Sequence, residues 1–338
     1  MDPKETFSLD AHKYSFPSIF VELDSFRELS SGDIQCNARI ETSQQPNPGL
    51  LYDGHLNLSS PRSRMDVLRM LEKRTDLAGE DWGAILQYVS VRSKERWRQG
   101  EPTVELAGEK LSPQGRYLLP PFLEMGAMCI LFGDGGFGKS TIAEGIAVSV
   151  ATGIDLLDSA PPKATPVLVL DWETDKDTWL ERLRAICRGV DIEVAKGVYY
   201  RHMIASLPEA ASYVRREIAR LGIGLVICDS LGLAGGEDPE AANTKIAVFK
   251  AARSFQCTFL AIDHVAHHDK SRPFGSVYTR NIARLVWGIH KAQKEGESRL
   301  TVALKNEKAN NSRLFSPRAF HLDYENDDND RLYKITFT

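Results

Sequence analysis

The sequence predicts an α/β fold in which helices flank a mainly parallel sheet, and three observations support this. From residue 122 onward, short apolar runs rich in β-formers alternate with amphipathic segments, as in βαβ units. One of these runs leads directly into a glycine-rich phosphate-binding motif. Later runs end in carboxylates, and ligands of open α/β sheets bind at that edge of the sheet.

The elements of this region fall into two groups. Five strands should form the parallel part, with helices at 139–152, 175–188, 208–221 and 239–256 between them: Ala127–Phe132, Val167–Leu170, Gly197–Tyr200, Leu225–Cys228 and Thr258–Ile262. Four later runs have no helix between them and predict an antiparallel C-terminal extension: Leu285–Ile289, Leu300–Leu304, Ala319–Leu322 and Leu332–Phe337.

The chain is expected to have three parts. Residues 1–60 contain three short β-like runs separated by turn signals, which predicts a small β-rich region. Residues 61–112 form a helical region and linker, because Ser60-Pro61 is a helix-start signal and apolar residues follow at helical spacing. Residues 113–338 hold the phosphate-binding domain. A basic cluster in the helical region is either the polar face of a helix or a nucleic-acid contact: Arg92, Lys94, Arg96, Trp97 and Arg98.

Bulk properties indicate a soluble cytoplasmic protein. No apolar run approaches the roughly 20 residues of a membrane span, and the first residues lack the features of a signal peptide. The five cysteines show no CxxC spacing and are expected to be free thiols. A net charge of −4 and a pI near 6.1 argue against coating nucleic acid through general basicity, but allow binding in a locally charged channel.

The phosphate-binding motif is the most specific feature. Gly133, Gly138, Lys139 and Ser140 satisfy G-x-x-x-x-G-K-[ST] between a strand pattern and a helix pattern. Backbone N–H groups must converge on a triphosphate there, which requires glycines and a helix N-terminus. Lys139 should reach the β- and γ-phosphates of ATP, Ser140 should ligate Mg²⁺, and Thr141 should contact the α-phosphate. The predicted nucleotide-binding residues are Gly133, Asp134, Gly135, Gly136, Phe137, Gly138, Lys139, Ser140 and Thr141.

Carboxylates at strand ends supply the rest of the predicted site. Glu173 is the candidate base that polarises the attacking water, and Asp171 is its rival, although both could instead cap the helix that starts near Asp175. Asp229 ends an apolar strand and is the expected Mg²⁺ partner beside Ser140.

A fourth strand ends in Asp263-His264. A polar residue there would lie near the γ-phosphate and could report its presence to the following loop. His267 and His268 follow closely, so a metal cluster is an alternative to loop histidines that face solvent or nucleic acid.

These four elements, in this order, resemble the RecA-like hexameric ATPases, especially plasmid RepA-type and DnaB-like replicative helicases and related phage ATPases. The resemblance covers roughly residues 117–323. It rests on the glycine-rich motif and the strands ending in Glu173, Asp229 and Asp263-His264. It continues through Pro273-Phe-Gly-Ser276 and Leu304-Lys-Asn-Glu-Lys308.

The resemblance implies further roles. Loops at about 231–244 and 265–275 would face a central channel and contact single-stranded DNA. The first loop is acidic at Glu237, Asp238 and Glu240, whereas the second is the better DNA-contact candidate and carries His267, His268, Lys270 and Arg272. Arg284, or else Arg280, resembles the arginine that is supplied across a subunit interface to stabilise charge on the γ-phosphate. Lys305 and Lys308 are further candidates, and each of these residues could also be an ordinary surface cation.

The resemblance therefore implies an ATP-hydrolysing motor that acts on single-stranded DNA as a homohexamer with Mg²⁺, and specifically a replicative helicase of a plasmid, phage or other mobile element. Replication or recombination proteins would be its partners. Two alternatives are a RecA-like ATPase for recombination or loading that does not unwind DNA, and a nucleotide-switched regulatory or assembly ATPase whose partner is a protein.

Overall fold

The computed structural model describes residues 3–8, 11–44, 49–74, 77, 79–100, 103–110, 115–236, 242–265, 277–293 and 296–338. The chain divides into two compact units, Met1–Leu111 and Ser112–Thr338.

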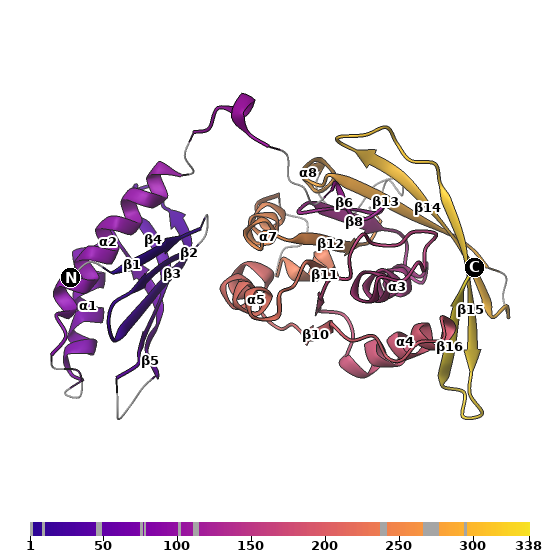
Figure 1. Ribbon diagram of the computed structural model, residues 1–338, viewed down its shortest axis with the longest axis horizontal. Coiled ribbons are helices and arrows are strands. Elements are labelled where there is room, and N and C mark those ends of the chain that lie inside the picture. Colours follow the sequence, from indigo (N-terminus) through magenta and orange to yellow (C-terminus); the bar gives the residue numbers. More distant parts are fainter. Residues whose placement is uncertain are drawn as a thin grey trace. The chain divides into compact units, whose positions relative to one another are not determined.

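The N-terminal unit is an antiparallel sheet with two helices on one face (Figure 1). Its strands follow chain order: β1 (Lys4–Phe7), β2 (Ala11–Ser15), β3 (Ile19–Glu28), β4 (Ile34–Thr42) and β5 (Gly49–Asn57). The helices are α1 (Pro61–Glu72) and α2 (Trp82–Gln99). Alternate residues of β4 are buried, and they form one core with the helices, so the β-rich and helical regions make a single unit.

Local signals explain where both helices begin. Ser60 accepts a hydrogen bond from the backbone N–H of Ser63, and Asp81 accepts one from the backbone N–H of Ala84.

Members of the basic cluster in α2 make contacts within the N-terminal unit. Arg92 pairs with Glu5 at 3.1 Å, and Trp97 stacks on Phe26 with ring centroids 5.3 Å apart.

The second unit is built on a nine-stranded sheet. A short strand pair precedes it, β6 (Tyr117–Leu119) with β7 (Leu123–Glu124). The parallel strands are β8 (Met128–Phe132), β9 (Val167–Asp171), β10 (Val198–His202), β11 (Leu225–Asp229), β12 (Thr258–Asp263) and β13 (Leu285–Ala292). The remaining strands are β14 (Arg299–Ala309), β15 (Arg318–Asn326) and β16 (Leu332–Phe337). Across the sheet the order is β10-β9-β11-β12-β8-β13-β14-β15-β16.

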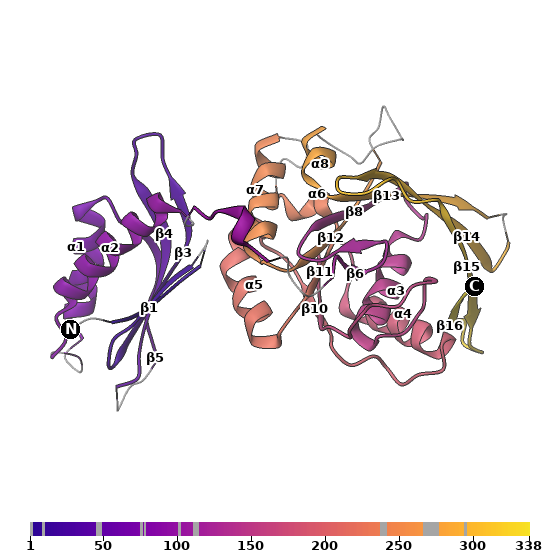
Figure 2. The same ribbon diagram turned by 45° about the horizontal axis from the view of Figure 1, so that its top comes forward.

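Helices cover both faces of the parallel strands, as predicted (Figures 1 and 2). α3 (Lys139–Thr152) and α4 (Lys176–Gly189) pack on one face, whereas α5 (Leu207–Leu221) and α7 (Ala242–Ser254) pack on the other. Two short helices, α6 (Leu231–Ala234) and α8 (Val277–Ile282), follow β11 and precede β13. All residues of β8, β9, β11 and β12 are buried, which explains their continuous apolar runs.

The assignment of Leu285–Ile289 to the antiparallel extension was wrong. β13 pairs parallel with β8, with Leu285 opposite Cys129, and only its other edge pairs antiparallel with β14. The extension therefore begins at β14. Gly288 permits this arrangement, because a Cβ there would approach the ring of Phe132 to 3.2 Å.

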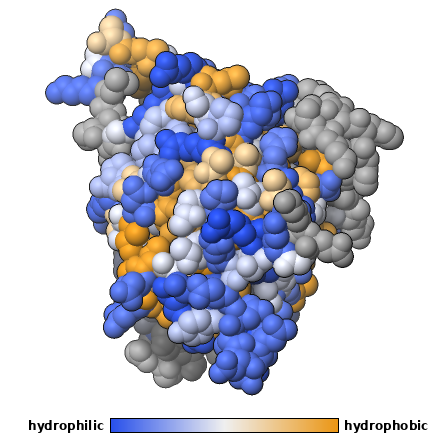
Figure 3. Space-filling view, turned by 90° about the vertical axis from the view of Figure 1, so that its right-hand side faces the viewer, coloured by the Kyte–Doolittle hydropathy of each residue, from blue (hydrophilic) through white to orange (hydrophobic). Residues whose placement is uncertain are grey.

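The antiparallel extension packs against α4. A Cβ on Gly189, the last residue of α4, would lie 1.8 Å from the carbonyl oxygen of Ile335, so the helix and β16 are in backbone contact. Figure 3 views the molecule from this side, where hydrophobic residues lie among polar ones. All five cysteines are free thiols, and no helix among the described residues has the length and apolar character needed to span a bilayer.

Candidate nucleotide site

The glycine-rich motif forms the turn between β8 and α3. Gly136 and Gly138 have φ angles of 69° and 83°, in the left-handed region that glycine adopts without strain. A Cβ on Gly133 would lie 2.2 Å from Cγ2 of Ile289, so only glycine fits there. The motif ends where α3 begins, and free N–H groups and the positive end of the helix dipole face the turn.

Lys139 lies across this turn. Its Nζ donates hydrogen bonds to the carbonyl oxygens of Gly133 and Asp134, both at 3.0 Å. The side chain is buried, and burial lowers its pKa, although the nearby carboxylates, Glu173 first, oppose that shift. The ammonium group is thus held at the loop that the sequence predicted to hold phosphates.

Ser140, in the first turn of α3, contacts Asp229, the last residue of β11. The hydroxyl of Ser140 donates to Oδ2 of Asp229 at 2.9 Å. Oδ1 of Asp229 is buried and has no hydrogen-bond partner among the described residues. Burial raises the pKa of Asp229 to about 6, and the charge of Glu173 adds to the shift. A hydroxyl beside a carboxylate with an unused oxygen fits Mg²⁺, which prefers oxygen ligands.

Glu173 and His264 also meet in this region. Glu173 follows β9 and His264 follows β12, and Nε2 of His264 lies 3.2 Å from Oε1 of Glu173. This hydrogen bond lowers the pKa of Glu173 and raises that of His264. The Glu173 side chain is 30% exposed, so an ionised carboxylate is open to an approaching water.

Asp171, the rival base, is occupied by local hydrogen bonds. It is fully buried and accepts bonds from the backbone N–H groups of Glu173 and Thr174 at 2.8 and 3.0 Å. The hydroxyls of Thr174 and Tyr200 also donate to it, at 2.6 and 3.0 Å. Asp175 caps α4 through the N–H of Thr178. Asp171 therefore shapes the turn that presents Glu173, and the open carboxylate is that of Glu173.

Two residues of α3, Thr141 and Glu144, contact side chains from distant parts of the chain. Thr141, the predicted α-phosphate contact, accepts a hydrogen bond from the hydroxyl of Tyr324 at 3.3 Å. Glu144 is fully buried and pairs with Arg182 at 3.2 Å. Sequence reasoning missed Tyr324, Glu144 and Arg182, because nothing in a single sequence indicates which distant residues contact α3.

Asp263 is the last residue of β12. It accepts a hydrogen bond from the backbone N–H of His264 at 3.0 Å, and burial raises its pKa to about 6.

Arg284, the first candidate for the trans-acting cation, lies at the opposite edge of the sheet. Arg284 is exposed and precedes β13, and its backbone N–H bonds to the carbonyl of Met128, at the start of β8 rather than at the phosphate loop. Arg280 donates to the carbonyl of Glu307 at 2.9 Å, and Lys305 pairs with the carboxylate of the same residue at 2.9 Å.

Lys308 has a local role. Its Nζ donates to the carbonyl oxygens of Arg280, Asn281 and Ala283 at 2.7 to 2.8 Å, at the C-terminal end of α8. These bonds explain its position without a partner subunit.

Parts of both predicted DNA-contact loops lie outside the described residues. These parts are 237–241 and 266–276, and they include Glu237, Asp238, Glu240, His267, His268, Lys270 and Arg272. The alternative metal cluster at His264, His267 and His268 falls partly on them. Among the described residues, no group of three or more His, Cys, Asp or Glu side chains could hold a metal ion.

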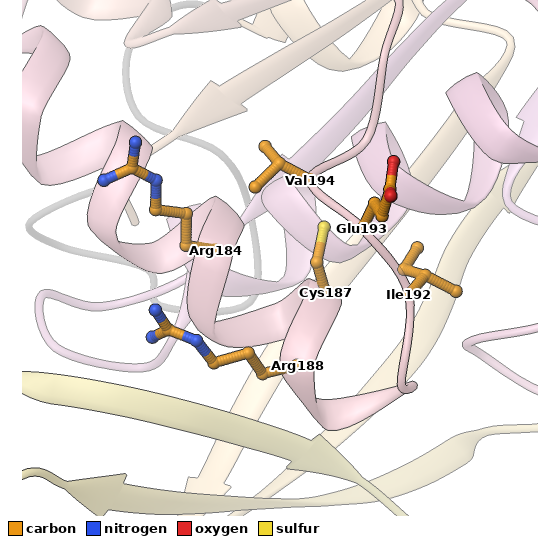
Figure 4. Close-up of a pocket in the computed structure, with 6 residues that line it drawn as sticks. All are labelled: Arg184, Cys187, Arg188, Ile192, Glu193 and Val194. Carbon is orange, nitrogen blue, oxygen red and sulfur yellow. The ribbon is translucent and has the colours of Figure 1, made fainter.

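A separate pocket lies at the C-terminal end of α4, away from the turn that carries Glu173 (Figure 4). Arg184, Cys187, Arg188, Ile192, Glu193 and Val194 line it. Arg188 is already engaged, because it donates to the carbonyl of Tyr333 at 2.8 Å and lies 4.5 Å from the centroid of that ring.

The glycine-rich turn, Lys139 and the Ser140–Asp229 pair, at the carboxyl edge of a parallel sheet, define a P-loop nucleotide-binding fold. A family described as the AAA domain matches residues 98–270, just over half of the 338-residue chain, and the chain belongs to that family. The fold is similar to that of a KaiC-like protein from the hyperthermophilic archaeon Pyrococcus horikoshii OT3, with a TM-score of 0.46 and 14% sequence identity over 64% of this chain and 93% of that one. No curated protein matches this sequence.

Proposed function

We propose that this chain is a RecA-like ATPase that hydrolyses ATP with Mg²⁺. The proposal rests on four residues at the carboxyl edge of the sheet. Lys139 and Ser140 begin the helix after β8, Asp229 ends β11, and Glu173 follows β9. Lys139 supplies positive charge for the β- and γ-phosphates, and the N-terminus of α3 supplies N–H donors. Mg²⁺ held by Ser140 and Asp229 would neutralise phosphate charge.

Glu173 acts as the base in this proposal. Its lowered pKa keeps the carboxylate ionised, so it can accept a proton from the attacking water. His264 orients that carboxylate through the 3.2 Å hydrogen bond. His264 immediately precedes the segment at about 265–275, which the resemblance places against DNA, so it would connect the Glu173 carboxylate to that segment.

We further propose that the ATPase is a motor on single-stranded DNA, as in a replicative helicase of a plasmid, phage or other mobile element. The order and spacing of the four motifs support this proposal. Both candidate DNA segments follow strands of the parallel sheet, β11 and β12, although α6 and the start of α7 form part of the segment 231–244 that was expected to be a loop. A channel that is only locally basic is compatible with the net charge of −4.

A homohexameric ring would complete the site. Within the described residues, no arginine forms an ion pair with Glu173 or Asp229, so an arginine that stabilises charge on the γ-phosphate would come from a neighbouring copy. Arg284 is exposed and remote from its own phosphate loop, as a trans-acting residue must be.

The deciding experiment is ATP turnover by the full chain with and without single-stranded DNA, followed by strand displacement on a forked duplex. A motor requires DNA-stimulated turnover, and a helicase also requires displacement. Stimulation without displacement would indicate the recombination or loading ATPase. Turnover that ignores DNA would favour a protein-directed assembly ATPase, and absence of ATP binding would overturn the whole assignment.

A further inference from the structure

β13 lies directly beside the phosphate loop (Figure 1). It pairs parallel with β8, with Gly288 opposite Phe132, the last residue before the loop. At the next position, Gly133 packs against Ile289, whose carbonyl oxygen would lie 3.0 Å from a Cβ on that glycine. Both the side chain and the backbone of Ile289 therefore lie against the first residue of the loop.

Lys291 follows Ile289 by two positions on the same strand, so both side chains point to the same face of the sheet. That face carries α3, because Ile289 shares a core with Ile142 of that helix. Nζ of Lys291 donates to the carbonyl oxygen of Gly136 at 3.3 Å and lies 5.4 Å from the centroid of the Phe137 ring. The phosphate loop thus has two lysine ammonium groups against it, Lys139 from its own helix and Lys291 from β13.

The strand order assigns these two lysines to different parts of a nucleotide. Glu173 and Asp229 follow or end β9 and β11, which lie on one side of β8, whereas β13 lies on the other side. The bond to be cleaved must face Glu173. Lys291 is therefore on the side of the phosphates that are not transferred.

We propose that Lys291 is a phosphate-binding residue for the α- and β-phosphates, and that it contributes to the affinity for ADP as much as to that for ATP. The inference rests on the proposed nucleotide-binding function. A purely local role, in which the lysine only supports Gly136 and Phe137, makes a different prediction: Lys291→Gln, which can still donate a hydrogen bond to the Gly136 carbonyl but carries no charge, would keep the affinity for ADP and ATP. Under the proposal, Lys291→Gln loses affinity as Lys291→Met does.

The test is the dissociation constant of the full-length chain for ADP, ATP and adenosine, measured by calorimetric titration. Glu173→Gln in every variant slows ATP turnover, so that ATP binding can be measured. Lys291→Met keeps the aliphatic stem against Phe137 but removes the charge, and should raise the dissociation constants for ADP and ATP by a similar factor of about 10. Adenosine binding should stay unchanged. Lys291→Arg should retain most of the affinity, and Lys196→Met, which alters an exposed lysine, is the matched control.

Each other result is decisive. Unchanged affinities in Lys291→Met overturn the inference. A loss for ATP alone overturns the assignment to the α- and β-phosphates, and affinity retained by Lys291→Gln overturns the inference in favour of the local role. If the unaltered chain binds neither ADP nor ATP, the proposed nucleotide-binding function fails. Binding by the unaltered chain is therefore measured before any variant is compared.

Discussion

Nε2 of His264 lies 3.2 Å from Oε1 of Glu173, although the two residues follow strands that are not neighbours in the sheet. β11 lies between β9 and β12, and it ends in the buried carboxylate of Asp229. The hydrogen bond therefore passes the end of β11 and brings the proposed base close to the proposed Mg²⁺ ligand. That proximity has an electrostatic cost, because the charge of Glu173 helps to raise the pKa of Asp229.

Glu173→Gln should separate nucleotide binding from hydrolysis. The amide retains the shape of the side chain but cannot accept a proton from water, so turnover should fall by about 10² or more while ATP still binds. Single-turnover hydrolysis and equilibrium binding of ATP measure the two effects. Asp171→Asn is the comparison, and it should act mainly by loosening the turn at Glu173 and Thr174. Normal hydrolysis by Glu173→Gln together with none by Asp171→Asn would reverse the two roles.

Lys139→Ala should abolish ATP turnover and strongly weaken nucleotide binding in a protein that remains folded. The substitution removes the charge expected to meet the β- and γ-phosphates but leaves the glycine turn in place. Circular dichroism would establish that the fold is retained, and titration with ATP would measure the loss of binding. Turnover near that of the unaltered protein would contradict the assignment of the site.

Arg284→Ala should bind ATP but turn it over slowly, because the neighbouring copy would lose its cation. Arg220→Ala, at an exposed arginine that pairs with Glu217 on its own helix, is the matched control and should leave turnover unchanged. Mixing Arg284→Ala with Lys139→Ala protein should restore part of the activity, since mixed interfaces can pair an intact loop with an intact arginine. Light scattering supplies the sharper test: a strictly monomeric species with full ATPase activity, in the presence of ATP and single-stranded DNA, would exclude a shared site.

The stability of the N-terminal unit should depend on pH through His12. This side chain is buried against the rings of Phe7 and Phe26, and burial, with the nearby charge of Arg96, lowers its pKa to about 4. An unfolded histidine has a pKa near 6.5, so below that pH the unfolded state takes up a proton that the folded state refuses. The free energy of unfolding should therefore fall between about pH 6.5 and pH 4, by up to about 3 kcal/mol.

Urea unfolding of the full chain across this pH range tests that prediction. His12→Phe should remove this contribution, because phenylalanine fits between the two rings and does not titrate. His55→Phe, at an exposed position, should leave the pH dependence unchanged. Parallel pH profiles for the unaltered protein and His12→Phe would contradict the prediction.

Strong local signals predicted most of the second unit. α3 spans residues 139–152 as expected, because the glycine motif marks its start and Gly153, with a φ of 84°, marks its end. In the N-terminal unit, β1 and β2 were missed. Both strands are short, and they are defined by their pairing, because β2 pairs with β3 and β1 pairs with β2.

The residues of the candidate site also differ in whether the sequence alone can predict them. Lys139, Glu173, Asp229 and His264 each stand at a motif or strand end that a single sequence can reveal, and the structure brings them together. Lys291 could not be found in that way. Its position depends on the pairing of β13 with β8, and a strand's apolar pattern does not identify its neighbour or its direction.

The order of strands also has a consequence for folding kinetics. β8 carries the phosphate loop, yet its two neighbours are β12 and β13: Met128 pairs with Phe259, and Cys129 pairs with Leu285. Such non-local pairing costs loop-closure entropy before any contact compensates it, and it slows folding. During synthesis, the loop is made long before the strands that hold it in place. A fragment that ends before β12 should therefore not bind nucleotide, even though it contains the whole glycine motif.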